Sequence, residues 1–393
     1  MHKISPKVFL LSVIVLLSLS ACTPTSGIFA GGNWQLSGLA HQHIRSLTVD
    51  FNNPQVIYAA NLQGKIFAST DGGQHWTERS DGLPPGSAIN SLSFDSTGKK
   101  LYAATDAGLF VSTDAALHWV AAGKVSTGQP DNYTALAFNS GEPHTLYAGT
   151  ALHGVLKSND DGNTWSAINT GIPAGTAINA LTFDSDSQQL WAATVSGIYR
   201  SDDRGASWQA LNTGLPASIV VYSVQPDTIV NGGTKGLIFA GTNHGFFISQ
   251  DAGAHWQTSQ EPLVGTNVRV VYVDFHKPST VLIGTDVGAL RSDNSGQTWG
   301  EVGPGIPRGQ SVYSLAWGTS DYSQLFAAAN DVYRYPGSSG GFGPNQLLEL
   351  LIAAVFFYAL YRLATRRRRP SKVDRTGEQA KAEEGSDLSK TNT

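Results

Sequence analysis

Carboxylates recur along this chain at a fixed distance before a tryptophan, and they are its most regular candidates for chemistry. Asp71, Asp160, Asp203 and Asp251 each stand five residues before a Trp. A glycoside hydrolase needs two carboxyl groups that face each other in a cleft, one of them with a raised pKa. The repeated aspartates instead have a Ser two residues before them and a Gly two residues after them, which is typical of a tight turn. We therefore expect them to be structural.

The complete pattern is Ser, then Asp two residues later, Gly four later and Trp seven later. Its first copy consists of Ser69, Asp71, Gly73 and Trp76, and the other complete copies end at Trp165, Trp208 and Trp256. Two further copies are incomplete: Ala116 replaces the Gly between Asp114 and Trp119, and Asn294 replaces the Asp before Trp299. This pattern is the Asp-box, or BNR repeat. Asp and Ser bond to turn amides, Gly takes a conformation closed to other residues, and Trp opens the next strand as an apolar anchor.

Seven of the nine tryptophans recur at intervals of 42 to 48 residues, which indicates a repeat architecture. Each interval contains an alternating strand, a second strand rich in small residues and a third strand that starts at Gly. The first strand occurs seven times, but the last copy, at 312–335, ends after its third strand. Residues 34–37 supply the missing fourth strand and close the ring, which leaves no open edge. We predict an all-β fold: a single seven-bladed β-propeller with Asp-box repeats over residues 33–336.

The run at 51–60 and its copies, followed by Gly-Leu-Phe-x-Ser and the Asp-box, resembles the photosystem II stability/assembly factor-like propellers. A weaker likeness extends to the sortilin and sialidase propellers. The first resemblance covers about residues 33–336, and it implies a β-propeller that binds photosynthetic reaction-centre subunits and is often a lipoprotein. The arginine-rich binding patch of that family has no evident counterpart in this sequence.

Both ends of the chain have membrane-targeting patterns. An apolar run ends in Leu-Ser-Ala-Cys, similar to a bacterial lipobox, so residues 1–22 are predicted to be a lipoprotein signal peptide with lipid on Cys22. An uncleaved signal anchor is the alternative. Near the other end, a Gly-rich linker at 337–345 precedes an apolar stretch at 346–364, which is predicted to be a transmembrane helix, with an interfacial helix as the alternative.

Charge gives the orientation. Four arginines at 366–369 indicate that the tail at 365–393 lies in the cytoplasm, where its polar composition predicts disorder. The propeller is then held on the extracytoplasmic face of a bacterial cytoplasmic membrane, with the bilayer contacted through Cys22 and residues 346–364. Residues 33–340 contain 15 Lys and Arg against 24 Asp and Glu. This acidic balance gives no reason to expect a nucleic-acid partner, so none is predicted. The single Cys excludes an intrachain disulfide and a multi-cysteine metal site.

Two classes of function remain open. Sialidases need three clustered arginines, a Tyr nucleophile with a Glu partner and an acid Asp, and the sequence assigns no such set among the eight arginines of residues 33–340. We therefore predict a non-catalytic protein-binding or assembly module without metal or cofactor, whose partner is a membrane protein or envelope component. A glycan-binding protein or a sialidase-like glycoside hydrolase is the alternative.

A ligand surface is expected on the face built from the loops between second and third strands and from the connections between blades. These loops differ from repeat to repeat, and the candidate binding residues on them are Asp106, His153, His244, Asp286 and Arg308. A metal site at Asp184 and Asp186 is a weaker hypothesis, because Asp-x-Asp alone lacks the further oxygen ligands that Ca²⁺ requires.

Overall fold

A computed structural model describes residues 32–336, apart from 126–131, 228–235, 260–262, 264, 275–276, 278 and 319–323. The predicted signal peptide with Cys22, the linker at 337–345, the helix at 346–364 and the tail at 365–393 lie outside the described residues. Nowhere in the described part of the chain is there a helix with the length and apolar character needed to cross a bilayer.

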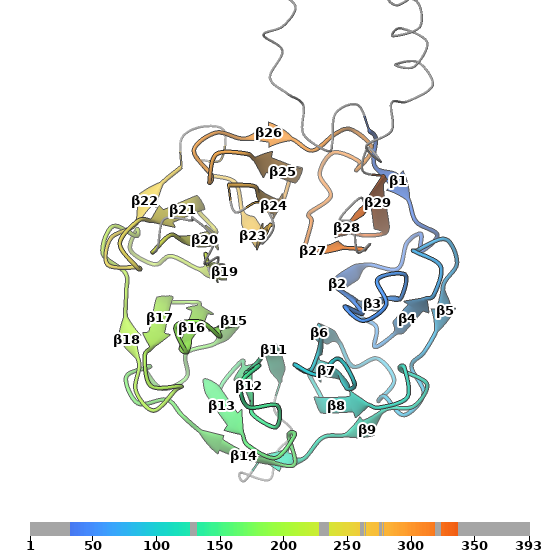
Figure 1. The fold of residues 1–393 in the computed structure, drawn as a ribbon, viewed down its shortest axis with the longest axis horizontal. Coiled ribbons are helices and arrows are strands. Elements are labelled where there is room, and N and C mark those ends of the chain that lie inside the picture. The colour runs from blue at the N-terminus through green and yellow to red at the C-terminus, as the bar shows by residue number, and fades with distance from the viewer. Residues whose placement is uncertain are drawn as a thin grey trace, which may run out of the picture. The chain divides into compact units, whose positions relative to one another are not determined.

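The described residues form seven β-sheets arranged in a ring, which confirms the predicted seven-bladed propeller (Figure 1). Blade 1 comprises β2 (Ile44–Val49), β3 (Ile57–Asn61), β4 (Ile66–Ser69) and β5 (Thr77–Glu78). Blade 2 comprises β6 (Ile89–Phe94), β7 (Leu101–Thr105), β8 (Gly108–Ser112) and β9 (Val120–Ala121). Blade 3 comprises β11 (Tyr133–Phe138), β12 (Leu146–Thr150), β13 (Val155–Ser158) and β14 (Thr164–Ala167), and β10 (Lys124–Val125) pairs with its outer edge in parallel.

The remaining four blades repeat this order. Blade 4 comprises β15 (Ile178–Asp184), β16 (Gln189–Thr194), β17 (Gly197–Ser201) and β18 (Gln209–Ala210). Blade 5 comprises β19 (Val221–Pro226), β20 (Ile238–Thr242), β21 (Gly245–Ser249) and β22 (Gln257–Thr258). Blade 6 comprises β23 (Val268–Val273), β24 (Val281–Thr285), β25 (Gly288–Ser292) and β26 (Gly300–Glu301). Blade 7 comprises β27 (Ser314–Trp317), β28 (Gln324–Ala328), β29 (Val332–Pro336) and, from the start of the domain, β1 (Gln35–Leu36).

The ring closes because the first strand of the domain completes the last blade. β1 pairs antiparallel with β29, with Gln35 opposite Arg334 and Leu36 opposite Tyr333. This pairing confirms the predicted source of the seventh blade's fourth strand. The additional strand β10 was not predicted. It lies in one of the longer intervals between tryptophans, where extra residues after β9 reach the outer strand of the next blade.

The hydrophobic core is divided into clusters between neighbouring blades. One cluster, for example, joins Ile44 and Phe67 of blade 1 to Phe326 and Val332 of blade 7. Small residues in the second strands permit this close approach: a Cβ on Gly149 would lie 2.6 Å from Ile178 Cγ2 in the next blade. Because each blade is buried only against its neighbours, ring closure is needed to complete the core.

Candidate functional site

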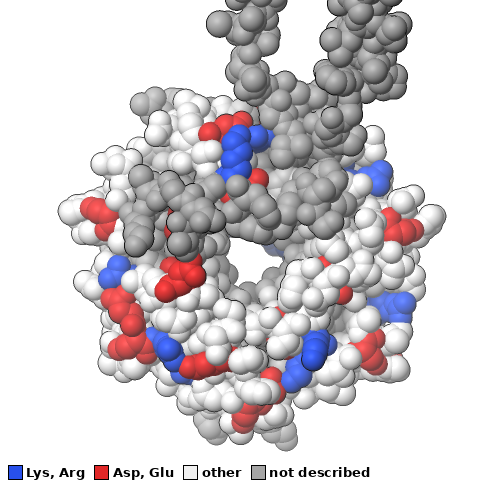
Figure 2. Space-filling model, viewed as in Figure 1, with Lys and Arg blue, Asp and Glu red and all other residues white. Residues whose placement is uncertain are grey.

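One face of the ring brings the loops between second and third strands next to the starts of the first strands. In five blades, a main-chain N–H at such a loop donates to the carbonyl just before the innermost strand; examples are Asp106 N to Ala88 O at 3.1 Å and Asp286 N to Asn267 O at 3.2 Å. Since the innermost strands surround the channel, which is open in the space-filling view, these loops form a rim around one channel mouth (Figure 2).

Every innermost strand places one variable side chain at this mouth. In blades 1 to 6, the second residue of that strand is skipped in the pairing with the second strand, so the pairing runs, for example, from Ile44–Asn61 to Ser46–Ala60. Such a β-bulge re-aims the side chain of the skipped residue. The residues concerned, with their counterpart in blade 7, are here called the bulge ring: Arg45, Asn90, Thr134, Asn179, Tyr222, Arg269 and Tyr313.

Four consecutive members of the bulge ring form an aromatic half, in blades 5, 6, 7 and 1. The guanidinium carbon of Arg45 lies 3.8 Å from the ring centroid of Tyr313. The guanidinium of Arg269 lies between two rings, 5.0 Å from Tyr222 and 5.5 Å from Tyr313. All four side chains are half-buried. Stacking on the face of a guanidinium leaves its N–H groups at the edge available for hydrogen bonds to carboxylates.

The other three members, in blades 2 to 4, form a polar half. Asn90 Nδ2 donates to Tyr133 O and Asn179 Nδ2 donates to Val221 O, both at 2.8 Å, while Thr134 Oγ1 donates to Ile178 O. Each acceptor belongs to the main chain of the next blade. These side chains therefore connect neighbouring blades.

One carboxylate partly neutralises the aromatic half. Arg269 Nε donates to Asp286 Oδ1 at 2.8 Å, and Ser311 Oγ donates to the same oxygen at 2.8 Å. Burial raises the pKa of Asp286, but hydrogen bonds from Asn267, Arg269 and Ser311 outweigh it and hold that pKa below its ordinary value. Asp286 is thus a partner of Arg269. No acidic side chain pairs with Arg45 within the described residues.

The other predicted binding residues lie on the same rim. Asp106 accepts a hydrogen bond from Ser87 Oγ at the tip of blade 2, and His244 is exposed at the tip of blade 5, with its Nδ1 2.9 Å from Asn243 Oδ1. His153 lies at the tip of blade 3 beside a pocket, and Arg308 is exposed on the connection between blades 6 and 7. The structure brings Asp286 next to Arg269, whereas the other four belong to separate blades or connections.

The Asp-boxes lie at the other end of the third strands and close turns. In the first copy, Ser69 Oγ donates to Asp71 Oδ1 at 2.8 Å, and it accepts from Gly73 N at 2.8 Å. The incomplete copies keep this geometry: Ser292 Oγ donates to Asn294 Oδ1 at 2.8 Å, and Ala116 has a φ of 64°. Most of the indole N–H groups donate to the preceding blade, as in the 2.8 Å bond from Trp119 Nε1 to Arg79 O, whereas the buried Trp165 Nε1 has no hydrogen-bond partner among the described residues.

The box carboxylates are strongly acidic. The hydroxyls of Thr164 and Ser207 hold the pKa of Asp160 and Asp203 at about 2, and the His255 side chain does the same for Asp251. Main-chain hydrogen bonds are the first cause of the low pKa of Asp71 and Asp114. A general acid in glycoside hydrolysis needs the opposite shift. The box carboxylates are therefore suited to stabilising turns as ionised hydrogen-bond acceptors. The later boxes end at Trp165, Trp208, Trp256 and Trp299.

Asp184 also closes a turn. Its Oδ1 accepts the main-chain N–H of Asp186 at 3.0 Å, and its Oδ2 accepts the hydroxyl of Ser187. Across the described residues there is no group of three or more His, Cys, Asp or Glu side chains arranged to hold a metal ion.

The bulge ring was not predicted from the sequence. Its members are of four residue types in no regular order from blade to blade, so they produce no repeat signal, and strand alternation does not reveal a bulge. A usable signal was present: each member directly follows the first apolar residue of an innermost strand, or Tyr133 in blade 3.

Comparison with known proteins gives one family match. The family model described as the DUF6242 beta propeller domain matches residues 116–341. Among curated proteins, the photosystem II assembly lipoprotein Ycf48 of Synechococcus sp. (strain CC9902) is 32% identical over 169 residues, which are 42% of this chain and 49% of the relative. The match thus spans about half the length of that relative. The assembly factor-like resemblance predicted from the sequence is confirmed.

Solved structures share the fold at lower identity. A Ycf48 structure described as bound to a D1 peptide superposes with a TM-score of 0.60 at 17% identity, covering 79% of this chain and 97% of that chain. The GH74 xyloglucanase of Xanthomonas campestris gives a TM-score of 0.61 at 15% identity, covering 80% of this chain and 55% of that chain. At these identities the likeness shows the propeller fold alone.

Proposed function

Because the chain belongs to the DUF6242 β-propeller family, and its propeller is of the assembly factor-like kind, we propose that it is a non-catalytic binding module for a protein partner. The partner presents an extended segment with a carboxylate to the channel mouth. The carboxylate contacts Arg45 and the exposed edge of Arg269. The role of the chain is then to hold or assemble a membrane protein or envelope component.

The observation that supports this proposal most directly is the Arg45–Tyr313 stack. The ring face is 3.8 Å from the guanidinium, so the guanidinium is held in one orientation before a ligand arrives. No acidic partner is described for it. A preorganised, unpaired arginine beside a channel is suited to bidentate recognition of a carboxylate. A structure of Ycf48 is described as bound to a D1 peptide, which supports a peptide as the form of the partner.

Membrane attachment is part of the proposal. Lipid on Cys22 and a helix at 346–364 would confine the propeller to the extracytoplasmic face, within reach of membrane proteins. The name of the Synechococcus relative includes the word lipoprotein, which supports the first attachment. Labelling with a radioactive lipid precursor should mark the wild-type chain and leave Cys22→Ala unmarked; equal labelling of both would contradict the lipid anchor.

A glycosidase function fits the described residues less well. The two Arg and two Tyr side chains of the aromatic half lack the Glu that a sialidase-type Tyr nucleophile requires. Among the described glutamates, Glu78 and Glu301 belong to the outer strands β5 and β26, and Glu142 belongs to the turn between β11 and β12. We expect no hydrolysis of fluorogenic sialosides or of polysaccharides by the purified chain.

Site-specific photo-crosslinking tests the binding function. A benzoylphenylalanine at Val287, which is exposed on the rim beside Asp286, should crosslink in cells to a discrete membrane protein. The same probe at Phe51, in the turn between β2 and β3 at the opposite end of the strands, is the control and should give no such band. Arg45→Met should remove the Val287 band. Equal bands from both positions, or a band that persists in Arg45→Met, would refute binding at this mouth.

A further inference from the structure

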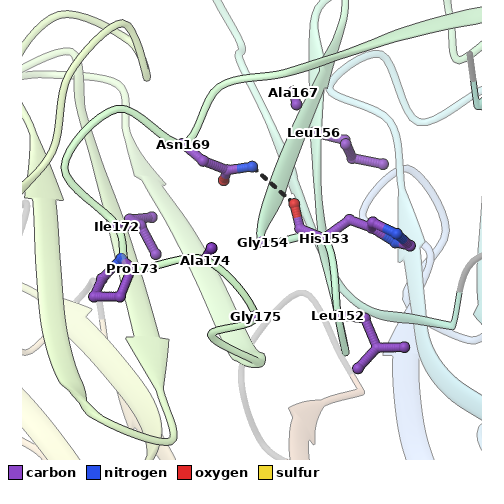
Figure 3. A pocket seen from close by; sticks show the side chains of 10 residues that line it. All are labelled: Leu152, His153, Gly154, Leu156, Ala167, Asn169, Ile172, Pro173, Ala174 and Gly175. Atoms are coloured by element: carbon purple, nitrogen blue, oxygen red, sulfur yellow. Dashed lines mark hydrogen bonds between the residues drawn. The ribbon is translucent and has the colours of Figure 1, made fainter. Parts of the chain in front are cut away.

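A pocket of about 350 Å³ opens on the same rim as the bulge ring, at the third blade. Figure 3 shows Leu152 and His153 at the hairpin tip between β12 and β13 on one side. On the other side is the connection from blade 3 to blade 4, with Ile172, Pro173 and Ala174. The pocket is close to the lower limit of ligand-binding pockets, which suits one or two side chains.

The Asn169 side chain in the lining is already used to build this pocket. Asn169 Nδ2 donates to His153 O at 2.8 Å, and its Oδ1 accepts from Val155 N at 2.7 Å, so one side chain fixes the hairpin to the connection. Gly154 is required for this contact, because a Cβ there would lie 2.4 Å from Asn169 Oδ1. Most of the remaining lining is apolar, and none of it belongs to Asp, Glu, Lys or Arg. A charged group would be desolvated there without a partner.

The rim of the pocket exposes apolar surface. The Leu152 side chain is 67% exposed, although a large aliphatic group in water gains by being covered. Val195, at the tip of the next blade, is also exposed, and its N–H donates to Ala177 O just beyond the connection that lines the pocket. The rim therefore has an uncharged apolar site near blades 3 and 4, and a cationic site in blades 6, 7 and 1.

We propose that this pocket is a second subsite, which takes an apolar side chain of the same partner segment whose carboxylate contacts Arg45. The inference rests on the proposed function and adds the partner's chemistry: an extended peptide with an acidic group and, several residues away, a Leu-, Ile- or Phe-like side chain. Both sites face the same rim, and the charge of each fits only one of the two groups. A segment of 12 residues spans up to about 40 Å when extended, which is enough to cross the mouth of a propeller.

Selection from a phage library of random 12-residue peptides tests the proposal with the full chain purified in detergent. The wild type should enrich peptides with an acidic residue and an apolar residue at a constant spacing. Ala174→Trp places an indole in the pocket from an exposed position, and it should abolish the apolar preference while keeping the acidic one. Arg45→Met should do the reverse. For the best wild-type peptide, Ala174→Trp should raise Kd about tenfold or more, as expected for one lost apolar side chain.

Two matched variants guard against general effects. Ala217→Trp makes the same change at the equivalent exposed position of the next connection, and Val120→Asp is the counterpart of Leu152→Asp at a 62% exposed residue on an outer strand. Ala217→Trp and Val120→Asp should leave the Kd for the best wild-type peptide within twofold. Leu152→Asp, which places a charge on the pocket rim, should raise that Kd. Enriched acidic peptides without an apolar preference would overturn the subsite and leave the proposed function standing. Failure to enrich any peptide would overturn both. Binding of the wild type to phosphatidylcholine vesicles that is lost in Leu152→Asp would assign the apolar rim to a membrane instead.

Discussion

The two halves of the bulge ring use one backbone position in two ways. In blades 2 to 4, the side chain at the bulge donates a hydrogen bond to the main chain of the next blade, as Asn179 does to Val221 O. In blades 5, 6, 7 and 1, the same position holds two tyrosines and two arginines that stack on one another, as Arg45 does on Tyr313. The innermost strand is thus regular in its backbone and divided in its chemistry.

The difference indicates a division between stability and binding. A bulge frees one residue per strand from the ladder, and the side chain then decides how the freed position is used. In the polar half, the bulge side chains donate hydrogen bonds to main-chain carbonyls of the next blade. In the aromatic half, stacking occupies the faces of the guanidinium groups and leaves N–H edges for a ligand. Substitutions in the two halves should therefore affect different measurements.

The largest effect is expected from removing both cations. Arg45→Met with Arg269→Met should weaken binding of the best selected 12-residue peptide about 100-fold, because each charge-assisted hydrogen bond contributes about 1.5–3 kcal/mol and part of Arg269 is already committed to Asp286. The unfolding temperature should change by no more than about 3 °C, since both side chains are only half-buried. Fluorescence anisotropy and thermal scanning measure the two quantities. Unchanged affinity with a large loss of thermal stability would reverse the assignment of this half.

The propeller could be predicted from the sequence because its signals are local and repeated. The Asp-box is a turn whose Ser, Asp and Gly contact one another within four residues, so even the copies with Ala116 and Asn294 are recognisable. Closure through residues 34–37 also followed from counting, since seven first strands require a fourth strand for the last blade. Strand β10 did not follow, because a two-residue parallel pairing has no pattern of its own.

The candidate site could be predicted only in part. Loop variation pointed to the rim on which the bulge ring lies, and one of its candidate residues, Asp286, forms an ion pair with Arg269. That this face binds a ligand stays a prediction. The Arg–Tyr stacks depend on contacts between blades 5, 6, 7 and 1, with Arg45 and Tyr313 separated by most of the chain. The contact between Arg45 and Tyr313 exists only once the ring has closed, and the stacks of Arg269 need blades 5, 6 and 7 to pack together. The pocket at Leu152 likewise needs the hairpin and the connection to be folded against each other.

The second prediction concerns the polar half. Asn179→Ala removes the hydrogen-bond donor to Val221 O. Because Val221 is fully buried, its carbonyl loses its side-chain partner away from water, and the substitution should lower the free energy of unfolding by about 1–2 kcal/mol. Peptide affinity should stay within twofold. Tyr222→Phe is the matched control at the bulge-ring position of the next blade. Only a hydroxyl is lost there, so the free energy of unfolding should fall by less than about 0.5 kcal/mol. Urea unfolding gives both values. Equal costs for the two variants would remove the distinction between the halves.

A smaller effect is expected from releasing Arg269. Asp286→Asn keeps the shape and the acceptor for Ser311 but removes the charge, so the affinity for the acidic peptide should rise about threefold to tenfold at low salt. The gain should shrink as ionic strength rises, because the contact is partly exposed to solvent. Asp106→Asn is the matched change at the tip of blade 2, where Ser87 is the donor and no described Lys or Arg forms an ion pair. An equal gain in both variants would mean that net charge alone governs affinity.

The smallest effect should be a difference in acid sensitivity between the halves. The folded-state pKa of Asp286 lies below its unfolded value, so its ionised form stabilises the fold. This contribution is fully present above the ordinary Asp pKa of about 3.9, and it is lost as the pH falls from there through the lowered value. The bulge residues of the polar half, Asn90, Thr134 and Asn179, do not titrate in this range. Asp286→Asn should therefore reduce the loss of stability between pH 5 and pH 3, measured as the urea midpoint, while Asn179→Ala should shift the midpoint equally at both values. Parallel pH profiles for wild type and Asp286→Asn would contradict the stabilising role of the Arg269–Asp286 pair.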